Sequence, residues 1–416
     1  MEATAGERRG LGHRPPLDGL RGIAFALVFL GHSNVQDVFA PAATAMFLFF
    51  ALSGFLITAL LLGELGATGR ISLPRFFERR ALRLLPALVL FLAVWLLVAA
   101  LFGSRPWISS VPGTSPGRAL GFPVALEGAA AALAYSSNWL GLTGLVHAWV
   151  PIGHLWSLNV EEQFYLSWAP LLFLLTRRTG DRDGARGRLL PAVIVTLGAL
   201  SLLETVLFLA HGVSANRIYI APDTRAAEFL TGALLAVAWS RGRLAWLGRP
   251  VAGAVAGGAS VAALVAAAAV LKHPGWAGQP EAWIVSTVAG GLVVALVCER
   301  SDGWAARVLS GRVLTYLGRR SYALYLWHYP WLTWFRSLGT VGVLLALAGT
   351  LASAEVSWRL VEARAMAYAR RSRPNTAAAN RSADPGESPQ KKAGSASSTS
   401  ITAGLPSSSR TRSTRA

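Results

Sequence analysis

Long apolar runs, each of about twenty residues, recur along this chain of 416 residues. A helix of about twenty residues is roughly 30 Å long, which matches the hydrocarbon core of a bilayer. The pattern therefore predicts an all-α, polytopic membrane protein with about ten transmembrane helices. We place these helices at residues 20–38, 42–63, 84–103, 158–177, 189–211, 226–240, 250–271, 281–298, 317–336 and 340–361.

The longest segment between these helices, residues 104–157, contains a weaker apolar stretch at 119–140. This stretch could form a re-entrant helix, an interfacial helix or an eleventh transmembrane helix. An eleventh crossing would reverse the orientation of every later helix and break the charge asymmetry described below. We therefore favour a re-entrant helix.

Composition divides the chain into three parts. Residues 1–16 are predicted to be a flexible cytoplasmic arm, and residues 17–365 a single membrane domain. Residues 372–416 are rich in Ser, Thr, Ala, Pro and basic residues. Such a composition cannot bury a core and predicts a disordered, basic cytoplasmic tail.

The distribution of charge predicts how the helices are oriented. The net charge is +18 at pH 7, although only 14% of the residues are charged and 53% are hydrophobic. With the N-terminus inside, most of the 39 Lys and Arg residues fall in cytoplasmic segments. The outer segments contain only Arg105, Arg118, Arg217, Arg225, Lys272 and Arg336. This asymmetry follows the positive-inside rule, so we expect a cell-membrane protein with both termini in the cytoplasm and no affinity for nucleic acid.

Cysteine and histidine usage gives no sign of a metal site. Cys298 is the single cysteine, which excludes an intrachain disulfide and a thiolate metal centre. No His or Cys cluster has the spacing of a zinc site. We expect neither a metal nor a tightly bound cofactor.

Arg21 and His32 share the first apolar run, where ionisable side chains are costly and often mark a substrate or proton path. In a helix their separation is about 16 Å along the axis, and both lie near one face. His32 is a candidate general base because imidazole titrates near neutral pH. The alternatives are a packing histidine and, for Arg21, an ordinary inside-facing charge.

An arginine cluster lies at the predicted cytoplasmic end of the third helix. Arg79, Arg80 and Arg83 belong to it, and Arg80 and Arg83 share a helix face. Arginine forks suit phosphate groups, so this cluster could hold a phosphorylated cytosolic donor such as coenzyme A. Membrane anchoring is the alternative.

The fourth predicted helix is entered through Trp156 and Ser157, followed by the adjacent carboxylates Glu161 and Glu162. Two carboxylates entering a membrane require partners or a wet cavity. They could orient His32, or pair structurally with Arg217 or Arg225.

Two later motifs complete the candidate chemistry. Asp223 and Arg225 flank Thr224 at the start of the sixth predicted helix, where they could bind an acceptor or cap the helix. His328 is a second histidine at membrane depth, six residues after Tyr322 and surrounded by aromatic residues suited to packing or to sugar stacking.

These patterns together resemble the acyltransferase-3 family of integral membrane O-acyltransferases over most of residues 15–365. Six features in order carry the resemblance: Arg21 and His32 at an Arg-x10-His spacing, Arg80 and Arg83 at an Arg-x-x-Arg spacing, residues 156–165, Asp223-Thr-Arg225, residues 321–330, and Glu362.

The resemblance implies transfer of an acyl group, often acetyl, from cytoplasmic acyl-CoA to a hydroxyl. It implies His32 as the general base or acyl carrier, with Arg21, Glu161 and Glu162 assisting it. It also implies donor binding by Arg79, Arg80 and Arg83. The residues expected to bind the acceptor are Asp18, Trp156, Ser157, Asp223, Arg225, Tyr322 and His328.

Family acceptors include cell-surface polysaccharides, peptidoglycan, lipid-linked glycans and macrolide antibiotics. We therefore expect O-acylation of a cell-surface or lipid-linked carbohydrate. A macrolide-type small molecule is the alternative acceptor. A multi-span transporter without acyl transfer is the alternative class of protein.

Overall fold

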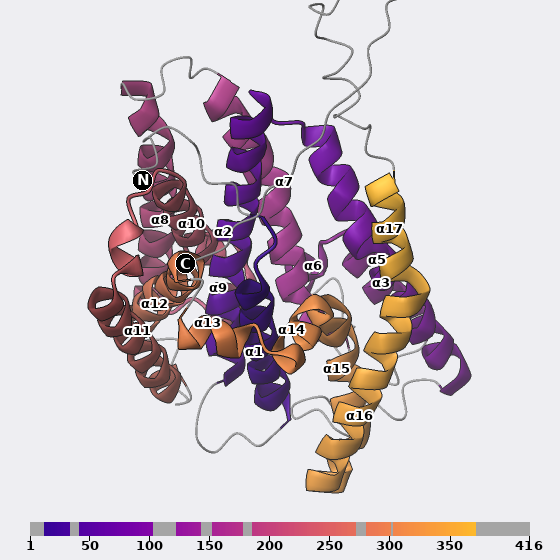
Figure 1. The fold of residues 1–416 in the computed structure, drawn as a ribbon. Helices are drawn as coiled ribbons and strands as arrows, with labels where there is room; N and C mark the ends of the chain where they lie inside the picture. The colour runs from indigo at the N-terminus through magenta and orange to yellow at the C-terminus, as the bar shows by residue number, and fades with distance from the viewer. Residues whose placement is uncertain are drawn as a thin grey trace, which may run out of the picture. The chain divides into compact units, whose positions relative to one another are not determined.

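The computed structural model describes residues 12–33, 41–102, 122–142, 152–177, 185–271, 280–300 and 303–371. All regular elements in these residues are helices, so the described part is all-α, as predicted (Figure 1). The predicted tail at 372–416 and most of the predicted arm at 1–16 lie outside the described residues. The first helix begins at Pro15, where proline is favourable because its ring fixes φ near the helical value.

The first half of the chain forms α1 (Pro15–His32), α2 (Pro41–Thr68), α3 (Leu73–Phe102), α5 (Phe122–Leu133), α6 (Ser137–Leu142), η1 (Gly153–Leu155), α7 (Trp156–Arg177) and α8 (Ala185–Ala210). The second half forms α9 (Ala215–Ile220), α10 (Pro222–Ser240), η2 (Ala245–Gly248), α11 (Pro250–Leu271), α12 (Pro280–Glu299), α13 (Trp304–Leu309), α14 (Arg312–Arg319), α15 (Ser321–Phe335), η4 (Arg336–Leu338), α16 (Gly339–Ser357), the π-helical η5 (Trp358–Glu362) and α17 (Ala363–Arg371).

Six helical segments in the described part are long and apolar enough to cross a membrane. They lie in α2, α3, α8, α11, α12 and the continuous stretch Ser321–Tyr368. That last stretch contains α15 and α16, which pack against each other. The chain is thus a multi-pass membrane protein, while the predicted total of about ten helices stays a prediction.

The apolar stretch predicted at 119–140 does not form one long helix. Helix α5 has 12 residues, and a turn with Tyr135 at φ +52° separates it from α6. Twelve helical residues rise about 18 Å, which is too short to cross the hydrocarbon core. The short helix agrees with a re-entrant segment better than with an eleventh crossing.

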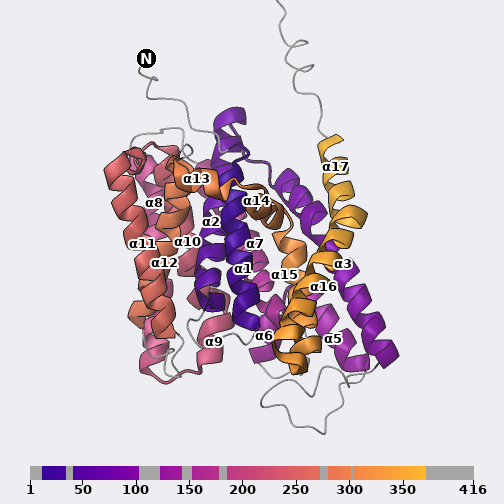
Figure 2. The same cartoon turned by 60° about the horizontal axis from the view of Figure 1, so that its bottom comes forward.

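Helix α2 lies at the centre of the bundle and α8 at its edge. Of the candidate membrane helices, α2 is the most enclosed by protein and α8 the least. Helix α10 packs along α2, while α1 packs against α2, α14 and α15. Figure 2 shows α13 and α14 at the upper end of the long helices and α6 and α9 at the lower end.

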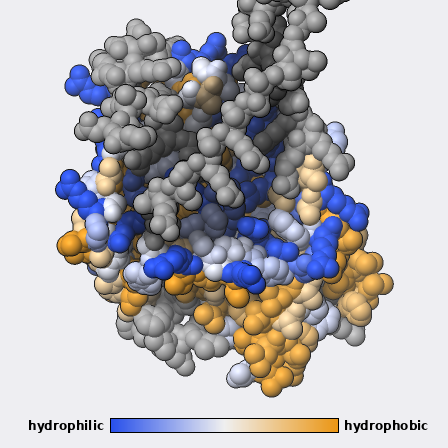
Figure 3. All heavy atoms as spheres, viewed as in Figure 1, coloured by the Kyte–Doolittle hydropathy of each residue, from blue (hydrophilic) through white to orange (hydrophobic). Residues whose placement is uncertain are grey.

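The outer surface carries large apolar side chains that a soluble protein would bury. Leu97 and Leu101 on α3, Val251 on α11 and Leu344 on α16 are all exposed. Figure 3 shows hydrophobic residues gathered on the lower part of the molecule and hydrophilic residues above them. Lipid contact explains this distribution.

Candidate functional site

Two histidines far apart in the sequence meet at one end of α1. Nδ1 of His32 lies 3.0 Å from Nε2 of His328 on α15, across 296 positions of the chain. Nδ1 of His328 lies 2.6 Å from the carbonyl oxygen of Tyr325. Because a carbonyl only accepts, His328 donates from Nδ1, and its Nε2 then accepts from His32. This chain of hydrogen bonds leaves Nε2 of His32 as the free basic nitrogen.

His154, on η1, is a third histidine in this cluster. Its ring centroid lies 5.2 Å from that of His328, and its ring stacks on Tyr329. Burial and the nearby His32 lower the pKa of His154 to about 3. Its Nε2 donates to the carbonyl oxygen of Leu326 at 3.2 Å, which places a proton on that nitrogen.

Tyr325 holds two parts of this cluster together. Its carbonyl accepts from His328, while its hydroxyl donates to the carbonyl oxygen of His154 at 2.7 Å. The hydroxyl of Ser157 lies 2.5 Å from the Tyr325 hydroxyl. We refer to His32, His154 and His328 with Tyr325 as the histidine cluster.

A pocket with a volume of 220 Å³ reaches the histidine cluster from one side. Its walls come from the end of α1, the end of α15, η4 and the start of α16. His32 is half-buried, whereas His328 is fully buried. His32 is therefore the member of the hydrogen-bonded pair that lines the opening.

Glu161 and Glu162 on α7 bind Arg80 on α3. Nε of Arg80 donates to Glu162 at 2.8 Å, and its Nη2 donates to Glu161 at 3.3 Å. Ser53 and Tyr165 also donate to Glu161. The guanidinium carbon of Arg80 sits 3.5 Å from the Tyr165 ring centroid. We call these five residues the Arg80 cluster.

The Arg80 cluster corrects two expectations. The predicted partners of the carboxylates were His32, Arg217 or Arg225, but the structure pairs them with Arg80. The side chain that orients His32 is His328. The physical reason is that α2, α3 and α7 converge, so the nearest cation neutralises both carboxylates.

The other predicted donor residues are placed differently from Arg80. Arg79 makes one contact, to Glu64 at 3.4 Å, and is largely exposed. Arg83 lies close enough to Arg21 and Arg80 for their positive charges to repel one another. Within the described residues Arg83 has no hydrogen bond or ion pair. Arg21 donates to Ser321 at 3.3 Å.

The Asp223 and Arg225 motif divides into two separate ion pairs. Asp223 binds the fork of Arg217, with one nitrogen–oxygen distance of 2.8 Å. Arg225 is fully buried and lies 3.0 Å from Glu228. The rings around its guanidinium are Phe47, Phe50, Trp156, Tyr219 and Trp283. Arg217 is thus held by Asp223, whereas among the described residues the three guanidinium nitrogens of Arg225 are buried without a hydrogen-bond partner and have only the ion pair with Glu228.

The remaining predicted acceptor residues do not form one site. Trp156 packs on Tyr219 beside Arg225, whereas Ser157 contacts the histidine cluster. Tyr322 is buried in an apolar core. Asp18 contacts His13 and Arg319 near the start of α1. Of this group, His328 therefore contacts His32 directly, and Ser157 contacts the histidine cluster through Tyr325.

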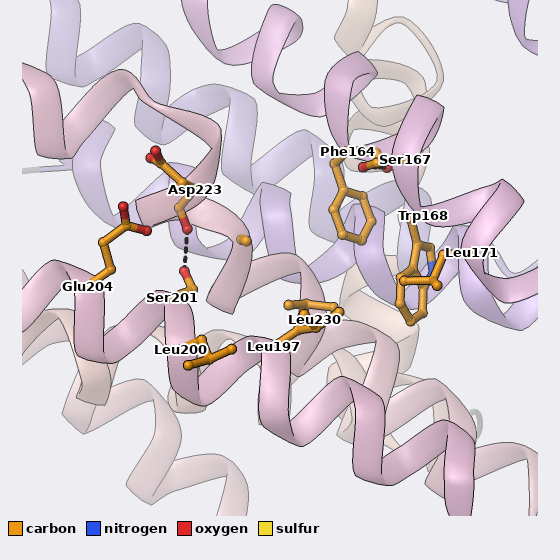
Figure 4. A pocket seen from close by; sticks show the side chains of 11 residues that line it. Phe164, Ser167, Trp168, Leu171, Leu197, Leu200, Ser201, Glu204, Asp223 and Leu230 are labelled. Carbon is orange, nitrogen blue, oxygen red and sulfur yellow. Dashed lines mark hydrogen bonds between the residues drawn. The ribbon is translucent and has the colours of Figure 1, made fainter. Parts of the chain in front are cut away.

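A second pocket, of 320 Å³, lies between α7, α8 and α10 (Figure 4). Its walls are mostly apolar, with Ser201, Glu204 and Asp223 grouped away from Phe164 and Trp168. None of the histidines lines it. This pocket is therefore separate from the histidine cluster.

The sequence patterns contain His154, Ser53, Tyr165 and Tyr325 but assign them no role in the site. Tyr165 and Tyr325 lie in segments 156–165 and 321–330, and His154 lies two residues before the first of these, so their positions are a usable signal. In the described residues no group of three or more His, Cys, Asp or Glu side chains could hold a metal ion.

Comparison with known proteins gives one family and consistent relatives. A family model described as an acyltransferase domain matches residues 15–361. The chain is 29% identical over 365 residues to O-acetyltransferase OatA of Staphylococcus aureus strains NCTC 8325 and COL. These alignments cover 84% of this chain and 56% of each relative, so the chain spans little more than half the length of these relatives. No solved structure matches significantly.

Proposed function

The chain belongs to the acyltransferase-3 family, and from this membership we propose that it transfers an acetyl group from cytoplasmic acetyl-CoA to a carbohydrate hydroxyl at the other face of the membrane. The similarity to O-acetyltransferases supports acetyl as the group transferred. The carbohydrate acceptor, the orientation of the helices and the cell membrane as location are parts of the same proposal.

One observation carries the proposal: the hydrogen bond between His32 and His328, whose direction frees Nε2 of His32. A general base needs an electron lone pair and a fixed orientation. The hydrogen bond between the two histidines provides both. His328 has the role that a buried carboxylate has in a catalytic triad, because it holds the imidazole in one tautomer.

The reaction follows from that geometry. Nε2 of His32 removes the proton from the acceptor hydroxyl while the oxygen attacks the thioester carbonyl carbon. The carbon–sulfur bond breaks, and the coenzyme A thiolate takes the proton from His32. The products are the acetyl ester and free coenzyme A, and His32 is neutral again. In the variant with an acyl-histidine intermediate, the same Nε2 attacks the thioester first.

The donor is expected at the opposite end of α1. Arg21 and His32 are the two ends of one helical face, about 16 Å apart. Arg83 and Arg21 provide positive charge for the coenzyme A phosphates, whereas Arg80 is already neutralised by two carboxylates. The donor phosphates would therefore bind Arg21 and Arg83 before Arg80. The extended thioester arm would then run along α1 toward His32.

The test uses the full chain reconstituted in liposomes with acetyl-CoA and a mixture of carbohydrate acceptors. Release of free coenzyme A and formation of acetyl ester are both measured. The His32→Ala variant should lose about 10²–10⁴-fold in transfer rate, the usual contribution of a general base. His211→Ala, which removes an exposed histidine on the surface, is the matched control.

Two results would contradict the proposal. One is transfer at near wild-type rate by correctly inserted His32→Ala protein. The other is a wild-type protein that forms no acetyl ester from acetyl-CoA with any acceptor. Insertion of each variant is checked by protease protection and by thermal unfolding.

A further inference from the structure

The pocket between α7, α8 and α10, which we call the α8 pocket, lies on the lipid-facing side of the bundle. Of the candidate membrane helices in the described residues, α8 is the least enclosed by protein. Leu197 and Leu200 of α8 line the pocket and are exposed. Its volume of 320 Å³ falls within the range of about 300–1,000 Å³ that is typical of ligand pockets. A mostly apolar pocket on such a helix can take up a hydrocarbon chain from the bilayer.

The two ends of the α8 pocket differ in chemistry. Glu204 and Asp223 lie at one end, and Phe164 and Trp168 lie at the other (Figure 4). Leu197 and Glu204 are about 10 Å apart along the axis of α8. Glu204 is itself about 9 Å from the C-terminal end of this helix. The acidic end is therefore closer to the membrane surface than the apolar end, which is also the arrangement of a lipid headgroup and its acyl chain.

The carboxylate of Glu204 is the polar group that the surrounding side chains leave open. Arg217 donates both nitrogens of its fork to Asp223, and the hydroxyl of Ser201 donates to the carbonyl oxygen of Asp223. Glu204 makes no hydrogen bond or ion pair with any described residue, although Asp223 and Arg217 are close enough to act on it electrostatically. Two carboxylates and one guanidinium leave an excess of negative charge here. Because a carboxylate at membrane depth is costly without a cation, the excess points to a positively charged ligand.

We propose that the α8 pocket binds one phospholipid whose headgroup carries an ammonium group, such as phosphatidylethanolamine. The ammonium group binds Glu204, and the first part of one acyl chain lies along Leu197 and Leu230 toward Phe164. An anionic headgroup such as phosphatidylglycerol is disfavoured, because the excess negative charge repels it. None of the histidines lines the α8 pocket, so the proposal does not depend on the transfer reaction.

The test measures which lipid occupies the α8 pocket. The full chain is reconstituted in nanodiscs of phosphatidylglycerol that contain a trace of a photoactivatable lipid with a diazirine in one acyl chain. Two such probes are compared, one with a phosphatidylethanolamine headgroup and one with a phosphatidylglycerol headgroup. After illumination, crosslinks are mapped by mass spectrometry. The phosphatidylethanolamine probe should label the facing parts of α7, α8 and α10 about tenfold more, as expected for one charge-assisted hydrogen bond.

Three variants separate recognition of the headgroup from binding of the chain. Glu204→Gln keeps the shape of the side chain without its charge, and should bring the labelling ratio of the two probes close to one. Leu200→Trp fills the apolar part and should lower labelling by both probes. Glu127→Gln removes an exposed carboxylate from α5 and is the matched control, which should keep the wild-type ratio. Thermal unfolding checks that each variant is folded.

Three outcomes overturn the proposal. Equal labelling of the wild-type pocket by the two probes would mean that the headgroup is not selected, and this comparison needs no variant. A preference that survives Glu204→Gln would mean that Glu204 does not recognise the ammonium group. Crosslinks confined to other surfaces of the bundle would mean that the α8 pocket holds no lipid.

Discussion

At the scale of single residues, the site depends on which imidazole nitrogen carries the proton. The carbonyl of Tyr325 can only accept, which fixes the proton on Nδ1 of His328. That proton in turn fixes the one on Nδ1 of His32. A backbone carbonyl thus determines the free nitrogen of the proposed base, two hydrogen bonds away.

His328 is therefore a positioning residue, and substitutions should separate orientation from binding. His328→Phe removes the acceptor for His32, and we expect kcat to fall about 10–100-fold with little change in KM for acetyl-CoA. His328→Gln offers a side-chain oxygen at a similar reach and should recover part of that loss. Steady-state rates and the pH profile of kcat measure both effects.

The pH profile distinguishes positioning from packing. If His328 orients the base, His328→Phe should alter the acidic limb of the profile, because that limb reports the titration of His32. A purely structural role would lower the amount of folded protein and leave the limb unchanged. Equal activity of the Phe and Gln variants would contradict the positioning role.

The Arg80 cluster makes a second prediction at this scale, on stability. Arg80→Ala leaves two partly buried carboxylates without their cation, and we expect a loss of about 3 kcal/mol in unfolding free energy. Arg79→Ala is the matched control. Its contact with Glu64 lies at the surface, so we expect the loss in unfolding free energy to be less than about 1 kcal/mol.

Thermal and denaturant unfolding in detergent measure this difference. If both variants lose the same stability, the Arg80 cluster has no special structural role. A double substitution of Glu161 and Glu162 to Gln in the Arg80→Ala background should restore part of the loss, because the uncompensated charge is then removed.

At the scale of elements, the site depends on how closely helices approach. α2 carries Ser53 of the Arg80 cluster, and α10 carries Asp223 and Arg225. A Cβ at Gly54 of α2 would lie 1.9 Å from the carbonyl oxygen of Phe229, and one at Gly232 of α10 would lie 2.0 Å from that of Ala51. The two backbones are in direct contact, which is typical of small residues at membrane helix interfaces.

Alanine at either position should separate these two helices. We expect Gly54→Ala and Gly232→Ala each to lower stability by more than about 2 kcal/mol, because backbone atoms cannot move aside as side chains do. Gly63→Ala is the control on the same helix, since a Cβ there meets nothing within 4 Å. Unfolding of purified protein compares the three, and equal stability of all of them would contradict the packing argument.

At the scale of the whole molecule, the sequence predicted the helical class of the fold and the single helix that carries Arg21 and His32. The spacing of Arg21 and His32 predicted that both lie on one helix, and α1 spans both. The predicted ends of two helices also agree with the observed ends where the composition changes sharply. Helix α11 ends at Leu271 and α12 at Glu299, each within one residue of its predicted end.

Partners across the chain could not be predicted in the same way. From the sequence alone, Glu161 and Glu162 could pair with any of several arginines. The convergence of α3 and α7 is what brings Arg80 to them. The contact between His32 and His328 joins positions 296 residues apart. Periodicity gives the face of a helix, but not the helix that this face meets, so such pairings depend on the three-dimensional packing.

The orientation in the membrane is the remaining large-scale prediction, and the structure provides a matched pair of serines to test it. Ser310, between α13 and α14, and Ser337, in η4, are both exposed and lie near opposite ends of α1. After the single cysteine is removed by Cys298→Ala, each serine is changed to cysteine. Positive-inside topology predicts that Ser337→Cys reacts with a membrane-impermeant maleimide in intact cells, whereas Ser310→Cys reacts only after permeabilisation.

The reverse labelling pattern would mean an inverted protein, and the pocket beside His32 would then face the cytoplasm with the donor. Labelling of both cysteines in intact cells would mean that α1 and α15 do not cross the membrane, and a base that links donor and acceptor across the bilayer would have no structural support.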